Sequence, residues 1–498
     1  MYVLEFLLEN KNNSYRYFDR MFWCKFRIQN ILISHAVKQM KKLRHDSAYT
    51  NAKKRYAVCK ADSSALLNAK IKEYGLAKAG LYAYVKAQQK KHAKYITSLE
   101  AQAIADSVLA AVNKYLYGDG KELRHKRLSD IRTASAKNLS NGIIPGMESR
   151  TCRFGLKKHS MDCRFIIKDY NQWAEACFQK DRDKVKFYRL SRKQFNSGYR
   201  YYVQFVIDAE PVRKHDCGEG RCGIDPGVSS IAAVTDGKCF LEELAPEAGR
   251  YNRKIVRVQR QMERSRRINS PGCYHEDGTV KKGVKFTKSR RYKKLQRKFR
   301  ALHRKRAACI RQSHSILADR ILEHCNSVIC EKMDFKKLAV RSKRPAKRQE
   351  KESSVTGKDG AVKAVHKFKR KKRFGKSLQC RSPGLFLEIL ERKCLRHGFQ
   401  MLEADTKAFK ASQYNHIDDT YVKKKLGDRW NYFTYKGEGI KIQRDLYSAF
   451  LIKNADSSLR HADREKCVDG FGRFMEMHDR CIQEVMEDSQ KRLSCFGF

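Results

Sequence analysis

The spacing of apolar residues predicts a helical segment near the start of the chain. Apolar residues recur at helical intervals from residue 22 to 43 and from 101 to 115. Both stretches belong to an alanine- and lysine-rich segment that runs from about Asp19 to Leu116. The turn-forming residues Gly118-Asp119-Gly120 end this segment, and residues 1–9 before it read as a strand. The first quarter of the chain therefore predicts one strand followed by a group of amphipathic helices.

The pattern changes to short strands over residues 129–212. Residues 187–192 and 200–207 are rich in aromatic and β-branched side chains, and the turn residues Asn196-Ser197-Gly198 separate them. Two such runs around a short turn predict a β-hairpin. Together the short strands predict a small β-barrel.

From Arg221 onward strands and helices alternate. Residues 221–244 predict a hairpin around Thr235-Asp236-Gly237-Lys238, and a long basic helical stretch follows from about residue 249 to 325. The later elements are a strand ending at Glu331, a basic mobile loop over 341–379, a helix over 383–395, a strand over 399–404, and helices over 445–454 and 463–486. This order matches a ribonuclease-H-like layout, a mixed sheet with helices packed on it. In such a layout Asp225 and Glu331 lie on neighbouring central strands, and Asp445 on a late helix faces them.

The charge of the chain indicates a polyanionic partner. The 498 residues include 108 Lys and Arg against 54 Asp and Glu, a formal charge of +54. So large an excess favours nucleic acid as the partner over a membrane surface. No run of about 18 apolar residues predicts a membrane span, and the first residues do not resemble a signal peptide. The 24 Tyr and 25 Phe include candidates for base stacking, although most aromatic residues belong to cores.

The 17 cysteines are scattered and form no Cys-x-x-Cys pair. This arrangement fits reduced thiols in a cytoplasmic protein better than a disulfide framework. It also gives no support to a closed four-cysteine zinc site.

Three acidic residues mark the ends of buried elements. Asp225 lies in Gly223-Ile224-Asp225-Pro226-Gly227, Glu331 closes the apolar run 328–330, and Asp445 opens the apolar stretch 445–452. Singly, each has a plainer interpretation: a turn aspartate, a surface charge at a strand end, and a helix N-terminal charge. Jointly, in so basic a chain, they predict a site for Mg²⁺, which prefers oxygen ligands. Two such ions can activate water and stabilise the leaving oxygen of a phosphodiester.

A basic segment lies between the first two carboxylates. Residues 281–311 hold 15 Lys or Arg in 31 positions and no acidic residue, so phosphate contact is favoured over a merely solvated helix face. The candidate nucleic-acid contacts are Arg290, Arg291, Lys293, Lys294, Arg297 and Lys298. Residues 421–430 alternate basic and apolar residues, and this pattern leaves nucleic-acid binding and simple packing equally open.

With these residues in place, the chain resembles the TnpB family of transposon-encoded RNA-guided nucleases and the compact type V CRISPR effectors derived from them. Residues 223–227 with 232–237 resemble the first RuvC motif, 328–334 the second, and 443–450 the third. The resemblance extends over residues 1–486 and implies a multidomain α+β protein. Its parts would be a ribonuclease-H-like RuvC nuclease domain and a wedge β-barrel with a helical recognition insert.

The chain departs from that family before the third motif. Members carry a four-cysteine zinc ribbon there, whereas residues 395–466 contain no cysteine and Ser412–Ile417 occupy the place. His416 with Asp418 and Asp419 is not a convincing metal set, so no structural zinc is expected. Gln443 stands where the family has an acidic residue, and Tyr447 stands where it has an asparagine.

The resemblance implies a division of the chain into seven parts. In order these are a first wedge strand (1–18), a helical recognition domain (19–128), a wedge β-barrel (129–215), a first RuvC-like part with the basic helical stretch (216–340), a basic mobile loop (341–380), a second RuvC-like part with the insert that replaces the ribbon (381–460), and a helical tail (461–498).

The expected function is that of an RNA-guided DNA endonuclease acting in the cytoplasm of a prokaryotic cell, at the nucleoid. Its partners would be a structured guide RNA and double-stranded target DNA, cut beside a short adjacent motif. Asp225, Glu331 and Asp445 would be the catalytic residues and would hold two Mg²⁺ ions. Two alternatives stay open: a cleavage-silent RNA-guided regulator, and a structure-selective nuclease that needs no guide.

Overall fold

The computed structural model describes residues 1–11, 13–56, 60–118, 120, 122–135, 144–146, 150–155, 159–169, 171–213, 215–276, 278–339, 347–356, 362–368, 374–425, 427–488 and 496–498. The chain divides into two units, residues 1–212 and 213–498. None of the described helices is both long enough and apolar enough to cross a membrane.

The first unit is built on a seven-stranded sheet with β1 (Tyr2–Leu8) at its centre. The strand order is β2-β6-β7-β1-β5-β4-β3. Bounds are β2 Thr133–Ser135, β3 Ile144–Gly146, β4 Thr151–Phe154, β5 Met161–Ile166, β6 Val185–Gln194 and β7 Tyr199–Ile207. The predicted hairpin is confirmed, because β6 and β7 pair around Asn196–Gly198 and Gly198 has φ +141°. The predicted barrel is confirmed in part: the described strands form one curled sheet, a half-barrel with β2 and β3 at its edges.

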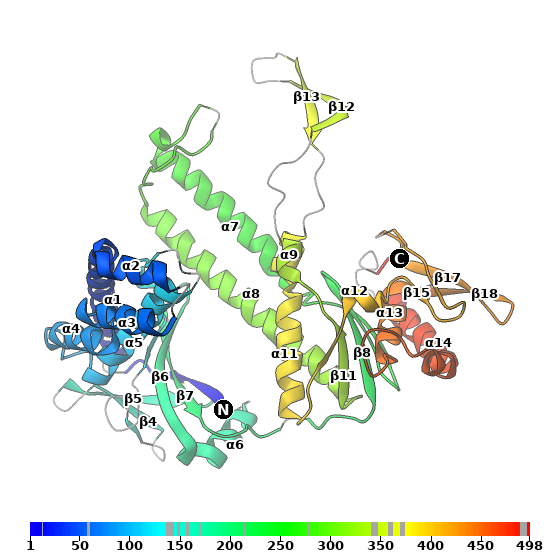
Figure 1. Ribbon diagram of the computed structural model, residues 1–498, viewed down its shortest axis with the longest axis horizontal. Helices are drawn as coiled ribbons and strands as arrows, with labels where there is room; N and C mark the ends of the chain where they lie inside the picture. Colours follow the sequence, from blue (N-terminus) through cyan, green and yellow to red (C-terminus); the bar gives the residue numbers. More distant parts are fainter. Residues whose placement is uncertain are drawn as a thin grey trace. The chain divides into compact units, whose positions relative to one another are not determined.

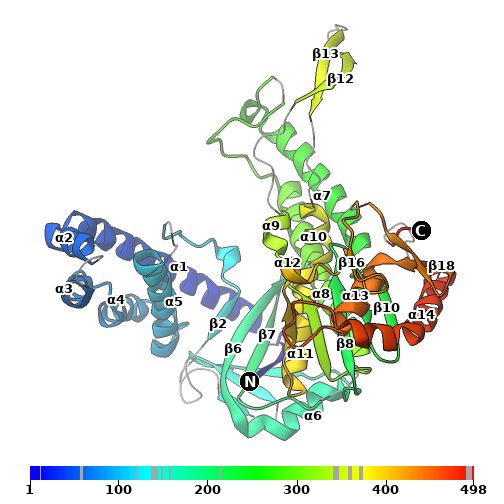
Figure 2. The same ribbon diagram turned by 45° about the vertical axis from the view of Figure 1, so that its right-hand side comes forward.

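Helices cover this sheet because its strands bury alternate residues. In β1 the side chains of Tyr2, Leu4, Phe6 and Leu8 are buried, as the period of two requires. The helices are α1 Ser14–His45, α2 Ser47–Arg55, α3 Lys60–Glu73, α4 Lys78–Lys90, α5 Ser98–Tyr117 and α6 Gln172–Asp181 (Figure 2). A capping box between Thr97 and Glu100 starts α5. The predicted helical segment after the first strand is thus confirmed.

The second unit contains a five-stranded mixed sheet in the order β10-β9-β8-β11-β14 (Figure 1). Bounds are β8 Arg221–Pro226, β9 Ser230–Val234, β10 Cys239–Glu243, β11 Ser327–Glu331 and β14 Leu402–Ala404. The first three strands are antiparallel, whereas β11 runs parallel to β8 and β14 runs parallel to β11. The sequence-based order of strands is therefore confirmed.

Both faces of this sheet are covered. Ala232, Val234 and Ile329 belong to one core with helices α13 (Arg444–Lys453) and α14 (Arg464–Glu487). Their sequence neighbours Ala233 and Val328 belong to a second core with α8 (Arg290–Leu322) and α11 (Pro383–Arg396). The alternation places helices on opposite faces and explains why β9 is buried along its whole length.

The basic stretch after this hairpin is two helices rather than one. Helix α7 (Ala248–Asn269) and α8 pack together through Val258, Met262 and Tyr292 (Figure 1). The predicted helical stretch over 249–325 is confirmed in both helices, and it is interrupted at Pro271-Gly272, where a 3₁₀ turn covers Pro271–Cys273.

The segment predicted as a basic loop also contains regular structure. Strands β12 (Lys347–Thr356) and β13 (Val362–Phe368) form an antiparallel hairpin, with short helices α9 (Phe335–Ala339) and α10 (Gly375–Arg381) on either side. The loop prediction is wrong for the residues of these strands and helices, and its residues 341–346, 357–361 and 369–373 lie outside the described residues. The high charge had masked the β-branched residues of the two strands, which favour extended backbone.

Two small hairpins occupy the place where the related family carries its zinc ribbon. Strand β15 (Tyr414–Asn415) pairs with β16 (Thr420–Tyr421), and β17 (Trp430–Tyr435) pairs with β18 (Glu438–Gln443). The short helix α12 (Thr406–Phe409) precedes them. Phe409, Tyr414 and Ile442 join the core of α13, so this insert is packed by apolar side chains onto the sheet domain.

Helix α13 lies unusually close to strand β8 at Gly223. A Cβ atom at Gly223 would lie 2.1 Å from the Ala449 carbonyl oxygen and 2.2 Å from the Lys453 nitrogen. Both obstacles are backbone atoms, so a side chain could be accommodated only by moving the helix. The contact therefore requires glycine.

We expect Gly223→Ala to lower the free energy of unfolding by about 1–3 kcal/mol, the range for overpacked sites. The matched control is Gly237→Ala in the β9–β10 turn, where an added Cβ meets nothing within 4 Å. Urea unfolding of the nucleic-acid-free protein measures both changes. Equal stability of the two variants would contradict the close contact.

Candidate functional site

Asp225 and Glu331 lie at the carboxyl ends of two adjacent parallel strands. Cys330 of β11 pairs with Ile224 of β8, so the next residue of each strand is Glu331 and Asp225. Ile224 and Cys330 point into the core with α8 and α11, and successive side chains alternate between faces. Both carboxylates therefore point to the opposite face, the one on which α13 packs.

Asp445 reaches this face from the first turn of α13. The side chain of Gln443 caps the helix by accepting a hydrogen bond from the Leu446 nitrogen at 2.8 Å. The backbone nitrogen of Gln443 donates to His478 Nε2 at 3.0 Å, which fixes the position of that cap. At the other end, Lys453 pairs with Asp236 at 2.7 Å and ties α13 to the β9–β10 turn. The sequence-based placement of the three carboxylates near one end of the sheet is confirmed.

The carboxylates affect each other's titration. Burial raises the pKa of Asp225 well above its ordinary value, and the negative charges of Asp445 and Glu331 raise it further. Burial also raises the pKa of Glu331 from 4.5 to about 7. Desolvation and like charge disfavour ionisation here, and a bound divalent cation would relieve both.

Two arginines hold the third carboxylate. Arg429 Nη1 lies 3.0 Å from Asp445 Oδ2, and Arg444 Nη2 lies 3.2 Å from Asp445 Oδ1. Arg444 also donates to the Asp428 carbonyl oxygen at 2.7 Å, so its guanidinium is fixed from both sides. Across the described part of the chain, no three His, Cys, Asp or Glu side chains gather closely enough to hold a metal ion. The carboxylate oxygens have the right chemistry for Mg²⁺, while Asp445 is engaged by cations of the protein itself.

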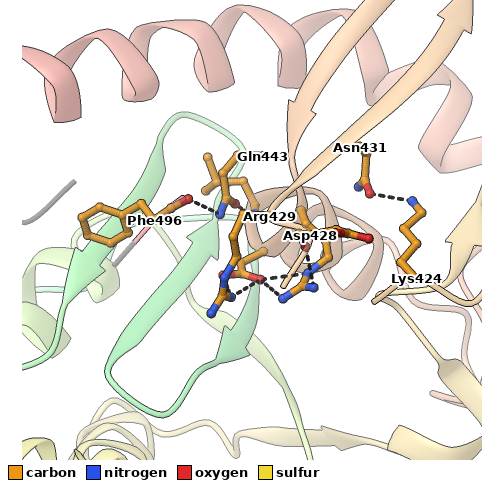
Figure 3. Close-up of polar contacts among 9 residues, drawn as sticks. Lys424, Asp428, Arg429, Asn431, Gln443 and Phe496 are labelled. Atoms are coloured by element: carbon orange, nitrogen blue, oxygen red, sulfur yellow. Dashed lines mark hydrogen bonds and ion pairs between the residues drawn. The ribbon is translucent and has the colours of Figure 1, made fainter. Parts of the chain in front are cut away.

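A neighbouring segment packs against Arg429. Trp430 Nε1 donates to the Gly497 carbonyl oxygen at 3.0 Å. Gln443 Nε2 donates to the Phe496 carbonyl oxygen at 3.5 Å (Figure 3). Gly497 has φ +90°, and a Cβ atom there would lie 2.3 Å from Arg429 Cβ. Residues 496–498 thus leave the Arg429 stem little room on that side.

Sequence reasoning did not identify Arg429 as a site residue. It lies in the segment 421–430, whose alternation of basic and apolar residues left nucleic-acid binding and packing equally open. Its ion pair with Asp445 joins the start of β17 to the start of α13. No sequence motif near Arg429 predicts that contact.

The polar residues of the insert have protein partners. His416 Nδ1 lies 2.6 Å from Tyr447 Oη, and burial lowers the pKa of His416 to about 4. Asn415 donates to Asp418 at 2.6 Å and Tyr414 donates to Asp419 at 2.8 Å. Tyr447, which stands at the asparagine position of the related motif, therefore fastens the insert to α13.

The six predicted nucleic-acid contacts lie on the first turns of α8. All six side chains are exposed, while Tyr292 on the other side of the helix is buried against α7. The residues are Arg290, Arg291, Lys293, Lys294, Arg297 and Lys298. Arg290, Arg291 and Lys293, in the first turn, oppose the helix dipole at a cost of about 0.3–1 kcal/mol each at low salt. A bound polyanion would remove that cost.

The fifteen cysteines that the structure describes carry free thiols. Cys222 and Cys330, on the strands of Asp225 and Glu331, are buried, and their pKa values are raised well above the ordinary value. A buried neutral thiol is a poor nucleophile and a poor metal ligand, so these residues act as core packing.

No protein-family model and no curated protein matches the sequence. The solved structures to which the chain is similar include two determined by cryo-EM. One is the complex of Cas12f1 with sgRNA and target DNA, with a TM-score of 0.47 and 10% sequence identity over 87% of this chain and 82% of that chain. The other is a CRISPR–Cas12f ternary complex, with a TM-score of 0.24 and 11% identity over 86% of this chain and 81% of that chain.

Proposed function

We propose that this protein is an RNA-guided DNA endonuclease that cuts DNA with a ribonuclease-H-like, RuvC-type site. The observation that carries the proposal is the convergence of Asp225, Glu331 and Asp445 at one end of a mixed sheet. The strand order, with an antiparallel hairpin beside two parallel strands, supports the ribonuclease-H-like assignment.

The three carboxylates would hold Mg²⁺ after drawing closer together than they lie here. When bound, the ions supply a nucleophilic water and neutralise charge on the leaving oxygen. To serve as ligands, Asp225 and Glu331 would have to be ionised, and Asp445 would have to turn from its arginine partners toward the cation. Arg429 would then be available to donate to a phosphate oxygen. The protein's own cations thus balance Asp445 until a metal and a substrate arrive.

The partners follow from the amount and distribution of positive charge. The formal charge of +54 exceeds what one short DNA strand would neutralise. A guide RNA together with double-stranded target DNA matches it, with base pairing reading the sequence and the protein contacting backbone and shape. The exposed basic face of α8 would contact one of these backbones.

The insert that replaces the ribbon would fold without zinc. Residues 395–466 contain no cysteine, and His416 is buried in a hydrogen bond with Tyr447. Apolar packing of Phe409, Tyr414 and Ile442 onto α13 takes the role that a structural metal would otherwise have.

We expect Asp225→Asn, Glu331→Gln and Asp445→Asn each to reduce cleavage by at least about a hundredfold, because few protein ligands hold each ion. Binding of RNA and target DNA should be retained. Cleavage and filter binding, measured in parallel with Asp183→Asn as a control at an exposed carboxylate, test this. If Asp445→Asn cleaves DNA at the wild-type rate, Asp445 does not belong to the site. If the wild-type protein does not cleave DNA, the cleavage-silent regulator becomes the better description.

Metal binding should release protons and strengthen as the pH rises. Glu331, with a pKa of about 7, is mostly protonated at pH 6 and mostly ionised at pH 8, so apparent Mg²⁺ affinity should rise about tenfold from this residue alone. Calorimetry in buffers of different ionisation enthalpy counts the protons. Glu331→Gln should reduce the number of protons released when Mg²⁺ binds. Arg429→Gln should raise the affinity for Mg²⁺ at constant pH, because Asp445 then loses one of its two arginine partners.

The raised pKa of Glu331 also affects the stability of the metal-free protein. Because the folded state holds the Glu331 proton more tightly than the unfolded state, stability should fall as the pH rises from about 4.5 to 7. Glu331→Gln should flatten that fall. An unchanged profile would mean that Glu331 titrates normally.

The guide is tested by reprogramming. The protein should co-purify with a discrete structured RNA, and changing the guide end of that RNA should move the cut to the matching DNA. The protein bound to an RNA with a scrambled guide sequence serves as the control complex. Cleavage that ignores the new sequence would make the guide-independent, structure-selective nuclease the better description.

A further inference from the structure

A row of four arginines follows one side of α7, away from the predicted contacts on α8. Arg253, Arg257, Arg260 and Arg264 are spaced by four, three and four residues. At 3.6 residues per turn they fall within about 60° of arc and extend about 16 Å along the helix. The buried side chains Ile255, Val258 and Met262 lie on the other side of α7. The row therefore lies on the solvent-facing side of an amphipathic helix.

The arginine row lines a groove of about 470 Å³. Lys376 of α10 adds a fifth cation, and the exposed side chain of Val256 contributes an apolar patch. Asn252, also in the groove, accepts a hydrogen bond from Arg306 at 2.9 Å, so its side chain is occupied by the protein. The groove thus offers cations and guanidinium planes and no carboxylate.

Within the described part of the chain, no ion pair neutralises these four arginines. The acidic residue of α7 beside them, Glu263, pairs with Arg266 and Arg267 instead. Like charges three or four residues apart on a helix destabilise it by about 0.2–0.5 kcal/mol a pair. The row contains three such pairs, so it costs stability and gains nothing from internal contacts.

We propose that this groove, the α7 arginine groove, binds the phosphodiester backbone of one nucleic-acid strand without reading its sequence. One strand of a duplex presents a phosphate about every 3.4 Å along its axis, so about 16 Å of helix faces four or five phosphates. An arginine guanidinium can donate two parallel hydrogen bonds to the oxygens of one phosphate. Val256 can lie against a sugar or a base edge. The site is separate from the carboxylates and deepens the proposed function by adding a second tract for nucleic acid.

The test compares two double substitutions that remove the same charge. Arg257→Gln with Arg260→Gln alters the middle of the groove, and Lys254→Gln with Arg392→Gln alters exposed cations outside it. Full-length protein is titrated with RNA, single-stranded DNA and an RNA–DNA heteroduplex of about 20 nucleotides, at several salt concentrations. The readout is binding, so a failure of cleavage elsewhere does not affect it.

The groove variant should lose about two phosphate contacts. The slope of log affinity against log salt should shrink by about 1.4 on single strands or 1.8 on duplex, while the control variant keeps the wild-type slope. A loss on RNA and heteroduplex assigns the groove to the guide strand, and a loss on DNA alone assigns it to the target. Equal slopes for the two variants on every probe would overturn the proposal. Thermal unfolding checks folding, and removal of the repulsive pairs should leave the groove variant at least as stable as wild type.

Discussion

The approach of α13 to β8 at Gly223 is the constraint on which the site depends. A helix that rests backbone to backbone on a strand brings its first turn to the strand's carboxyl end, where Asp225 lies. Gln443, His478 and the Lys453–Asp236 pair then fix the helix along its own axis. A larger residue at 223 would lift α13 from the sheet and carry Asp445 away from the other two carboxylates. One absent side chain therefore sets the geometry of residues more than a hundred positions apart in sequence.

The positive charge of the second unit comes at some cost to folding. Arg429 and Arg444 neutralise Asp445, but the basic faces of α7 and α8 have few internal partners in the described residues. Such faces repel themselves and reduce stability unless a polyanion is present. Binding energy from nucleic acid would then also be folding energy for the α7–α8 hairpin, because a ligand that binds only the folded form stabilises it.

The sequence indicated those features that depend on local pattern. Apolar alternation predicted the strands, turn residues predicted the hairpins at 196–198 and 235–238, and the ends of apolar runs marked Asp225, Glu331 and Asp445. Features that depend on distant contacts were missed. Arg429 pairs with a residue sixteen positions away across a hairpin. Whether the first sheet closes into a barrel depends on whether its edge strands β2 and β3 meet. Pro271-Gly272 predicts a break between helices, but the break was missed because basic residues recur on both sides of it.

The two small hairpins before α13 have a practical consequence for handling the protein. A domain whose fold depends on zinc thiolates is damaged when a chelator removes the metal. Here apolar side chains and the His416–Tyr447 hydrogen bond fasten the insert to the core, and residues 395–466 offer no thiol. Under the zinc-free assignment, EDTA would empty the carboxylate site and leave the architecture intact. Adding Mg²⁺ back would then start the reaction in a complex already assembled on its target, which allows a single round of cutting to be timed.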